Sequence, residues 1–332
     1  MQEANSDALQ PCSEKQTNKQ TNKIMKLKRN LIALATGASL FAYSANAEII
    51  ITDELSLYGY MDLAYSDTDN GSDESSESVA EFELGFLFET PDSPFFAQME
   101  LSFSDDDTDD TDFETAIVGY NYNENLVLSA GNILSYQGWE TYDATGLYQF
   151  SYAGRGQNPF YTAAYAVGAA ADYATDSFAL GVWIGDSDDY SGTSYEFLAA
   201  YTGVEGLTIK AIYADDPGYT TYNLWASYEL GGFTFAAEYI INEYEETVAG
   251  DVDETNGYLL LVNYAWEKAG LTLRYSAQED DLVGGGSLED FSMVTLSPSY
   301  VFSDKLSALV EVSFIEEEED ETFYAVEMIY AF

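Results

Sequence analysis

Residues 233–242 read FTFAAEYIIN, and this stretch shows the pattern that decides the fold. The aromatic Phe235 and Tyr239 share one parity of position, while the polar Thr234 and Glu238 share the other. Successive side chains of a β-strand point to opposite faces, so this segment has one apolar and one polar face. The pattern predicts a strand that lies between an apolar and a polar environment.

Similar segments recur along the chain, and each has roughly the ten residues that a tilted membrane-spanning strand needs. The alternation is clear in residues 81–89 (EFELGFLFE) and 306–314 (LSALVEVSF). After Ala47 no stretch has the 18 or more consecutive apolar residues that a transmembrane helix needs. Sixteen segments of this kind are predicted. They are residues 54–66, 79–90, 95–104, 112–122, 125–132, 161–173, 177–187, 193–203, 205–214, 219–230, 232–242, 255–266, 270–279, 289–302, 304–315 and 321–332.

The connections between these segments alternate between short and long. Residues 91–94 (PDSP), 204–206 (VEG) and 231–232 (GG) are short, whereas the long connections are acidic, as in residues 67–78 (DTDNGSDESSES). Short periplasmic turns and longer outer loops are typical of bacterial outer-membrane barrels, whose strand number is even. A soluble sandwich does not predict this alternation, and no propeller repeat is present. The sequence therefore predicts an all-β, transmembrane antiparallel β-barrel of about 16 strands.

The composition excludes several classes of function. The chain has 59 Asp and Glu against 11 Lys and Arg, a net charge of −48, no His and a single cysteine, Cys12. Phosphate binding needs clustered bases, so a nucleic-acid partner is excluded. The lack of His removes the usual general base, and we predict neither an enzyme nor a cofactor. A calcium-loop pattern begins at Asp105 but fails at Asp110 and Ala116, so no metal site is predicted.

The N-terminal region has the three parts of a secretory signal peptide. Residues 25–47 read MKLKRNLIALATGASLFAYSANA, with a basic start, an apolar run and small residues at the end. We expect the signal peptide to be cleaved after Ala47. Residues 1–24, which precede the signal peptide, are expected not to be part of the working protein, and the barrel is expected over residues 48–332. Residues 1–47 hold six of the bases and three of the acids, so the exported chain has 56 acids and five bases. Those bases are Arg155, Lys210, Lys268, Arg274 and Lys305.

Three segments carry a family resemblance. Residues 55–62 (LSLYGYMD) resemble the opening strand of general porins, residues 131–149 resemble a strand and inward loop of the OmpL-like β-barrel porin group, and residues 324–332 end on an aromatic Phe332 as outer-membrane barrels do. The chain thus resembles the Gram-negative outer-membrane porin superfamily. The resemblance implies a homotrimeric passive channel for small hydrophilic solutes or ions, surrounded by outer-membrane lipid and lipopolysaccharide. A non-conducting structural or adhesion barrel is the alternative.

The longest connection, residues 133–160, is poor in acids and rich in aromatic residues. We expect this third outer loop to fold into the barrel and narrow it; packing outside, against another subunit, is the alternative. General porins set basic wall residues against an acidic loop, but this chain has few bases. Acidic side chains are expected on the inner wall, and a wall lined by carboxylates favours cations. The expected inward-facing acids are Glu83, Glu100, Glu114, Glu238, Glu311 and Glu327. The constriction candidates are Trp139, Glu140, Asp143, Arg155, Lys210, Arg274 and Glu311.

Overall fold

The computed structural model describes residues 48–69, 74–104, 112–140, 143–154, 160–187, 191–245, 248, 251–288, 290–317 and 320–332. The expected N-terminal extension and signal peptide, residues 1–47, lie outside the described residues. Within the described part of the chain, no helix is long and apolar enough to cross a bilayer. The elements are β1 (Ile49–Ile50), β2 (Leu55–Asp69), β3 (Glu74–Glu89), β4 (Phe95–Ser104), β5 (Asp112–Asn121), β6 (Leu126–Leu134), the 3₁₀ turn η2 (Ala144–Gly146), β7 (Tyr165–Ala174), β8 (Phe178–Asp186), β9 (Thr193–Val204), β10 (Leu207–Asp216), β11 (Tyr219–Leu230), β12 (Phe233–Tyr244), β13 (Val252–Trp266), β14 (Ala269–Leu282), β15 (Phe291–Ser303), β16 (Leu306–Glu316) and β17 (Glu321–Ala331).

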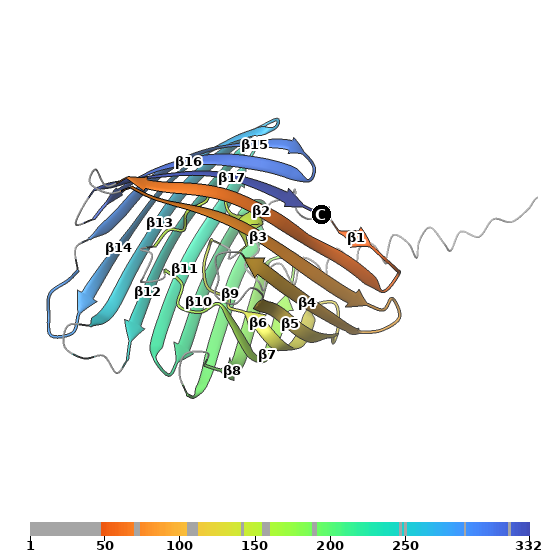
Figure 1. The fold of residues 1–332 in the computed structure, drawn as a ribbon. Helices are drawn as coiled ribbons and strands as arrows, with labels where there is room; N and C mark the ends of the chain where they lie inside the picture. Colours follow the sequence, from red (N-terminus) through yellow and green to blue (C-terminus); the bar gives the residue numbers. More distant parts are fainter. Residues whose placement is uncertain are drawn as a thin grey trace, which may run out of the picture.

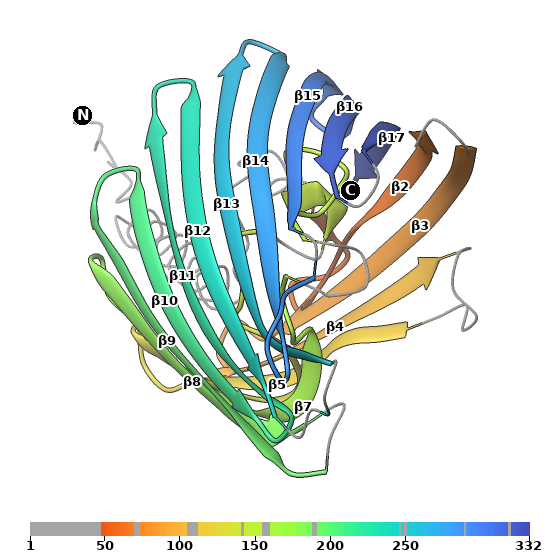
Figure 2. The ribbon, with the colours of Figure 1, turned by 90° about the vertical axis from the view of Figure 1, so that its left-hand side faces the viewer.

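Strands β2 to β17 form one antiparallel sheet that closes into a barrel (Figures 1 and 2). Each strand pairs with the next along the chain, and β17 returns to pair with β2, from Thr322 opposite Asp69 to Ala331 opposite Tyr60. Closure pairs the edges that an open sheet would leave free. The predicted barrel of sixteen membrane-spanning strands is confirmed.

The two ends of the described barrel meet beside β2. The short β1 pairs with β2, with Ile49 opposite Leu57, just beyond the end of β17. The terminal Phe332 exchanges two backbone hydrogen bonds with Gly59, at 2.9 and 3.1 Å. A Cβ at Gly59 would lie 2.1 Å from the carbonyl oxygen of Glu83, and the φ of Gly59 is +155°. The close pairing of β2 with β3 at this position therefore requires glycine.

The two faces of the strands match the sequence pattern. On β12, Phe235 and Tyr239 point outward and are exposed, whereas Glu238 and Asn242 point inward and are buried. The outward face is rich in large apolar side chains along the whole barrel, as lipid contact requires. The inward face carries most of the buried polar and charged groups.

Two expectations, one about the start of a strand and one about the length of a connection, are wrong in detail. The strand predicted over residues 161–173 begins only at Tyr165, because Tyr161 is buried inside the barrel as part of the preceding loop. The alternation of short and long connections also fails at Pro217-Gly218, an outer connection as short as a periplasmic turn. There the Asp216 carboxylate accepts the Gly218 backbone N–H at 3.2 Å, which closes the tight turn.

The third outer loop, which joins β6 to β7, folds into the barrel. Its yellow-green ribbon lies within the ring of strands in Figure 2. Aromatic side chains of this loop join inward-facing apolar side chains of the wall in one buried cluster, so the inward fold is confirmed and the outside-contact alternative is wrong. The cluster comprises Tyr136, Trp139, Ala153, Phe160 and Tyr161 of the loop with Ala170, Trp183, Leu198, Ile212, Trp225, Ala236, Ile240, Leu259 and Leu261 of the wall.

Candidate functional site

Buried carboxylates on the wall hold the start of the inward loop. Glu196 on β9 accepts the backbone N–H of Tyr136 at 2.8 Å. Glu238 on β12 accepts the backbone N–H of Trp139 at 3.0 Å and the hydroxyl of Tyr161 at 2.6 Å. Hydrogen bonds to an ionised acceptor are roughly twice as strong as neutral ones. The wall acids thus fix both the first part of the loop and the segment that returns to β7.

A third wall carboxylate holds the far side of the loop. Glu311 on β16 accepts the successive backbone N–H groups of Phe150 and Ser151, at 2.8 and 2.9 Å, and the Ser151 hydroxyl. The hydroxyl of Ser313, two residues along the same strand, also donates to Glu311 at 2.6 Å. The side chain of Glu311 is fully buried, so these donors replace the water that a free carboxylate would bind.

A buried ion pair joins the middle of the loop to β14. The Arg274 guanidinium donates to Oε1 of Glu140 at 2.6 Å and to the Ser151 carbonyl oxygen at 2.6 Å. Glu140 also accepts the side-chain amide of Gln149 at 2.9 Å and the backbone N–H of Ala153 at 2.8 Å. Burial raises the pKa of the Glu140 carboxyl, and the Arg274 guanidinium acts against this rise. The carboxylate therefore depends on Arg274 to stay charged.

Lys210 on β10 lies beneath the loop and is 1 % exposed. Its ammonium group is 5.2 Å from the centre of the Trp225 ring, and Trp225 in turn meets Trp139 edge to face at 5.4 Å. Its Nζ makes no hydrogen bond to a described residue, so its charge is balanced by nearby carboxylates and the Trp ring. The carboxylates that act on it are those of Asp172, Glu196 and Glu238.

A second group of acids lies on the inner wall formed by β3, β4 and β5. Carboxylate oxygens of Glu81, Glu83 and Glu114 lie within 4.8 Å of one another. Glu100 and the loop residue Asp143 are their charged neighbours. Burial, followed by the charges of Glu100, Glu114 and Glu81, raises the pKa of Asp143 to about 8. We call these five residues the acidic wall cluster.

Neutral donors orient part of the acidic wall cluster. The Tyr60 hydroxyl donates to Glu81 at 3.0 Å. The Tyr58 hydroxyl and the Gln98 amide donate to Glu100 at 2.5 and 2.8 Å. The four bases that the structure describes lie elsewhere, two beneath the loop and two at periplasmic turns: Lys210, Arg274, Lys268 and Lys305.

The residues predicted as constriction candidates fall into two groups. Five of them lie in the buried contact between the loop and the wall: Trp139, Glu140, Lys210, Arg274 and Glu311. Asp143 instead lies at the acidic wall cluster. Arg155 lies outside the described residues. Glu81 and Glu196 were not predicted as site residues, although the alternation along their strands places both on the inward face.

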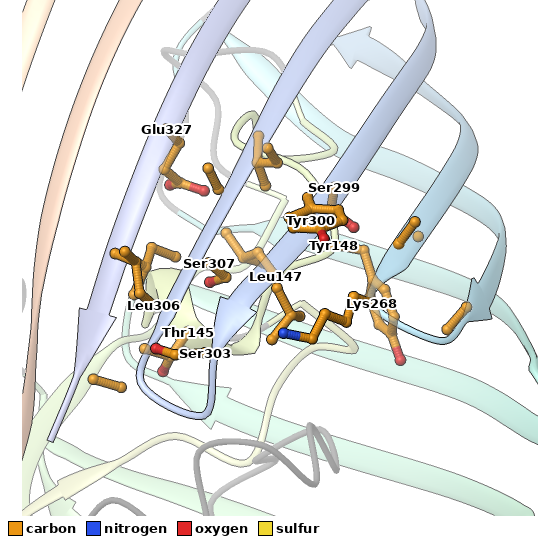
Figure 3. A pocket seen from close by; sticks show the side chains of 18 of the residues that line it. Thr145, Leu147, Tyr148, Lys268, Ser299, Tyr300, Ser303, Leu306, Ser307 and Glu327 are labelled. Atoms are coloured by element: carbon orange, nitrogen blue, oxygen red, sulfur yellow. The ribbon is translucent and has the colours of Figure 1, made fainter.

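A cavity of about 160 Å³ lies between the loop and the periplasmic ends of the last strands. Figure 3 shows Leu147 and Tyr148 of the loop facing Lys268, with Glu327 at the opposite side. The ammonium group of Lys268 donates to the Phe302 carbonyl oxygen at 3.1 Å. Positive charge is thus found at this end of the barrel, apart from the acidic wall cluster.

A closed barrel with an apolar outer surface, an inward loop and a charged inner wall defines a pore-forming protein of the outer membrane. A family model described as Gram-negative porin matches residues 31–320. The chain therefore belongs to the Gram-negative porin family, as the sequence resemblance indicated. Among the curated proteins none matches the sequence.

Solved structures share this fold at low sequence identity. OmpT of Vibrio cholerae is 15 % identical, with a TM-score of 0.64 over 86 % of this chain and 100 % of that one. OmpF of Salmonella typhi, solved in complex with daunomycin, is 16 % identical, with a TM-score of 0.68 over the same shares. A mutant of the Rh. blastica porin is 18 % identical, with a TM-score of 0.60 over 84 % of this chain and 100 % of that chain. The likeness supports the fold.

Proposed function

We propose that this porin is a passive channel for small hydrophilic solutes and ions, and that it prefers cations. The observation that carries the proposal is the acidic wall cluster, in which Asp143 of the loop faces carboxylates of the wall. Each carboxylate of the cluster attracts a passing cation when it is ionised, which for Asp143 requires a pH above about 8, and a carboxylate-lined pore favours cations.

The buried bases favour the same conclusion. Arg274 and Lys210 are at most 1 % exposed, and the loop covers both. Their charges serve the attachment of the loop, because each is surrounded by carboxylates or by carbonyl groups. They are therefore poor candidates for attracting anions from solution. Among the predicted constriction candidates, we propose that Asp143 contacts the permeating ion and that Glu140, Arg274 and Glu311 position the loop.

The surroundings of the channel follow from the same family. We propose that the chain is exported by the signal peptide at residues 25–47, cleaved after Ala47, and that three copies assemble in the outer membrane among lipid and lipopolysaccharide. An in-vitro folded OmpT of Vibrio cholerae, a structural neighbour with a TM-score of 0.62, is described in trimer form. Catalysis is not part of the proposal, since the sequence has no His to act as general base.

Single-channel recording tests this proposal against the alternative of a non-conducting structural barrel. Purified protein added to a planar lipid bilayer should produce discrete upward steps of conductance. A protein in which the aromatic cluster around the loop fills the lumen would insert without steps. Absence of steps from protein that is folded by circular dichroism would refute the channel.

A further inference from the structure

The two exposed bases of the described chain border one cavity. Lys268 lies in the turn between β13 and β14, and Lys305 lies in the turn between β15 and β16. Both line the cavity of about 160 Å³ beneath the inward loop. The other two described bases, Lys210 and Arg274, are buried under the loop. The exposed positive charge of the described chain is thus gathered at one place in the barrel.

The ammonium groups of these lysines are available to a ligand. Glu267 and Asp304, the acids beside them in the turns, form no ion pair with either lysine in the described structure. An ammonium group has three donors, and that of Lys268 donates only one hydrogen bond within the described chain, to the Phe302 carbonyl oxygen. For Lys305, the only hydrogen bond donated to a described side chain comes from the backbone N–H.

The opposite side of the cavity is acidic. Glu327 on β17 borders the cavity, and Figure 3 shows its carboxylate on the side away from Lys268. Asp62 on β2 is hydrogen-bonded to Glu327, and both side chains are at most 3 % exposed. Two neighbouring carboxyl groups repel each other when both are ionised, so a positive group beside them is stabilised. The cavity therefore has a basic end and an acidic end.

The wall between the two ends is mostly apolar and carries a few hydroxyls. Leu147 of the loop, Leu309 on β16 and Ile329 on β17 line it. The hydroxyls of Ser299 and Ser307 also border the cavity (Figure 3), and neither forms a hydrogen bond with another described residue. An apolar cavity of about 150 Å³ holds benzene, so this one has room for a branched or cyclic apolar body.

We infer that this cavity binds a small zwitterion with an apolar body, of the chemical class of the apolar α-amino acids. The carboxylate of the ligand lies at Lys268 and the serine hydroxyls, its ammonium group lies at Glu327, and its side chain packs against Leu147. A simple anion would bring negative charge toward Glu327, and a simple cation would bring positive charge toward the lysines, so neither fits both ends. Mostly apolar walls with a few placed polar groups are typical of small-molecule sites.

This inference goes beyond the proposed function and does not require the channel to prefer cations. Its test uses the full protein in detergent and three probes that share the same branched apolar body. They are L-leucine, isocaproate, which lacks the ammonium group, and isoamylamine, which lacks the carboxylate. Saturation-transfer NMR of the methyl protons measures the binding of each probe, and protein-free micelles give the signal that arises from partition into detergent.

We expect saturable binding of L-leucine that is tighter than the binding of either other probe. Glu327→Gln should weaken leucine binding at least about tenfold, because a buried hydrogen bond to a charged group is lost. Lys268→Met, at an exposed position, should weaken it about two- to fivefold, whereas Lys268→Arg keeps the charge and should preserve binding. Glu205→Gln, which removes an exposed acid from the turn between β9 and β10, is the matched control and should leave binding within about twofold.

Lack of saturable leucine binding in the wild type would overturn the site, as would equal binding in the wild type, Glu327→Gln and Lys268→Met. Isocaproate or isoamylamine binding as tightly as leucine would overturn the assignment to a zwitterion. If Glu327→Gln does not form the folded barrel, Ala265→Trp, at an exposed position that lines the cavity, fills the cavity instead and should abolish binding. A protein that binds leucine but does not conduct would refute the proposed function alone, and one that conducts without binding leucine would refute this inference alone.

Discussion

The buried ion pair between Glu140 and Arg274 is where one substitution should act most strongly. Glu140→Gln keeps the size of the side chain but leaves the Arg274 guanidinium, 0 % exposed, opposite a neutral amide. Arginine cannot release its proton in a protein, so the charge would stay buried. Loss of one partner from such a pair costs about 3–5 kcal/mol in the free energy of unfolding, and we expect this range.

Urea unfolding of the refolded protein in detergent, followed by tryptophan fluorescence, measures this cost. Trp139 and Trp225 meet at the contact between loop and wall, so the signal reports on the attachment of the loop. Glu243→Gln, at an exposed position on β12, is the control and should change the free energy by less than about 0.5 kcal/mol. The double variant Glu140→Gln, Arg274→Met should be more stable than the sum of the single losses predicts. A cost below about 1 kcal/mol for Glu140→Gln would show that the ion pair does not hold the loop.

Three further outcomes are expected. In Arg274→Met, burial raises the pKa of Glu140 without opposition from the guanidinium, so the folded-state pKa exceeds the unfolded one and stability is lost as pH rises through it. The deficit in stability relative to the wild type should therefore shrink as the pH falls toward the ordinary pKa of a glutamate, and a deficit independent of pH would contradict this. The closed barrel should stay folded in SDS until boiled, and identical migration before and after boiling would speak against it. Intact mass of protein from the outer membrane should correspond to a chain that begins at Glu48, and a mass that includes residues 25–47 would disprove cleavage after Ala47.

The barrel could be predicted from the sequence because lipid imposes one strict rule on each strand. Side chains such as Phe235 and Tyr239 must face outward, which forces Glu238 and its neighbours to face inward. The same rule placed Glu83, Glu114 and Glu311 on the inner wall, where the structure has them. The inward fold of the third loop could also be predicted from its aromatic residues. A loop that extended into bulk water would leave them exposed, so they indicate packing against the inner wall.

The contacts of the site could not be predicted, because they depend on register and on pairs far apart in the chain. Nothing near Glu140 in the sequence indicates Arg274 as its partner. Alternation placed Arg274 and Lys210 on the inner face, but burial beneath the loop depends on the path of the loop itself. The β-bulge at Glu114, where the pairing of β4 and β5 shifts register, could not be predicted either. The segment as a whole keeps its alternation of apolar and polar side chains, so the sequence does not indicate the extra residue.

The zero-current potential across a tenfold KCl gradient tests the central claim of a cation-preferring pore most directly. Charges at the outer mouth are screened over about 8 Å at physiological ionic strength and over about 3 Å at molar salt, while the acidic wall cluster lies closer to a passing ion. We expect the dilute side to be positive, with part of this potential kept at molar concentrations. Above about pH 8, where the Asp143 carboxylate is ionised, Asp143→Asn should reduce the potential. A potential of the opposite sign in the native protein would mean that anions are preferred and would contradict the account.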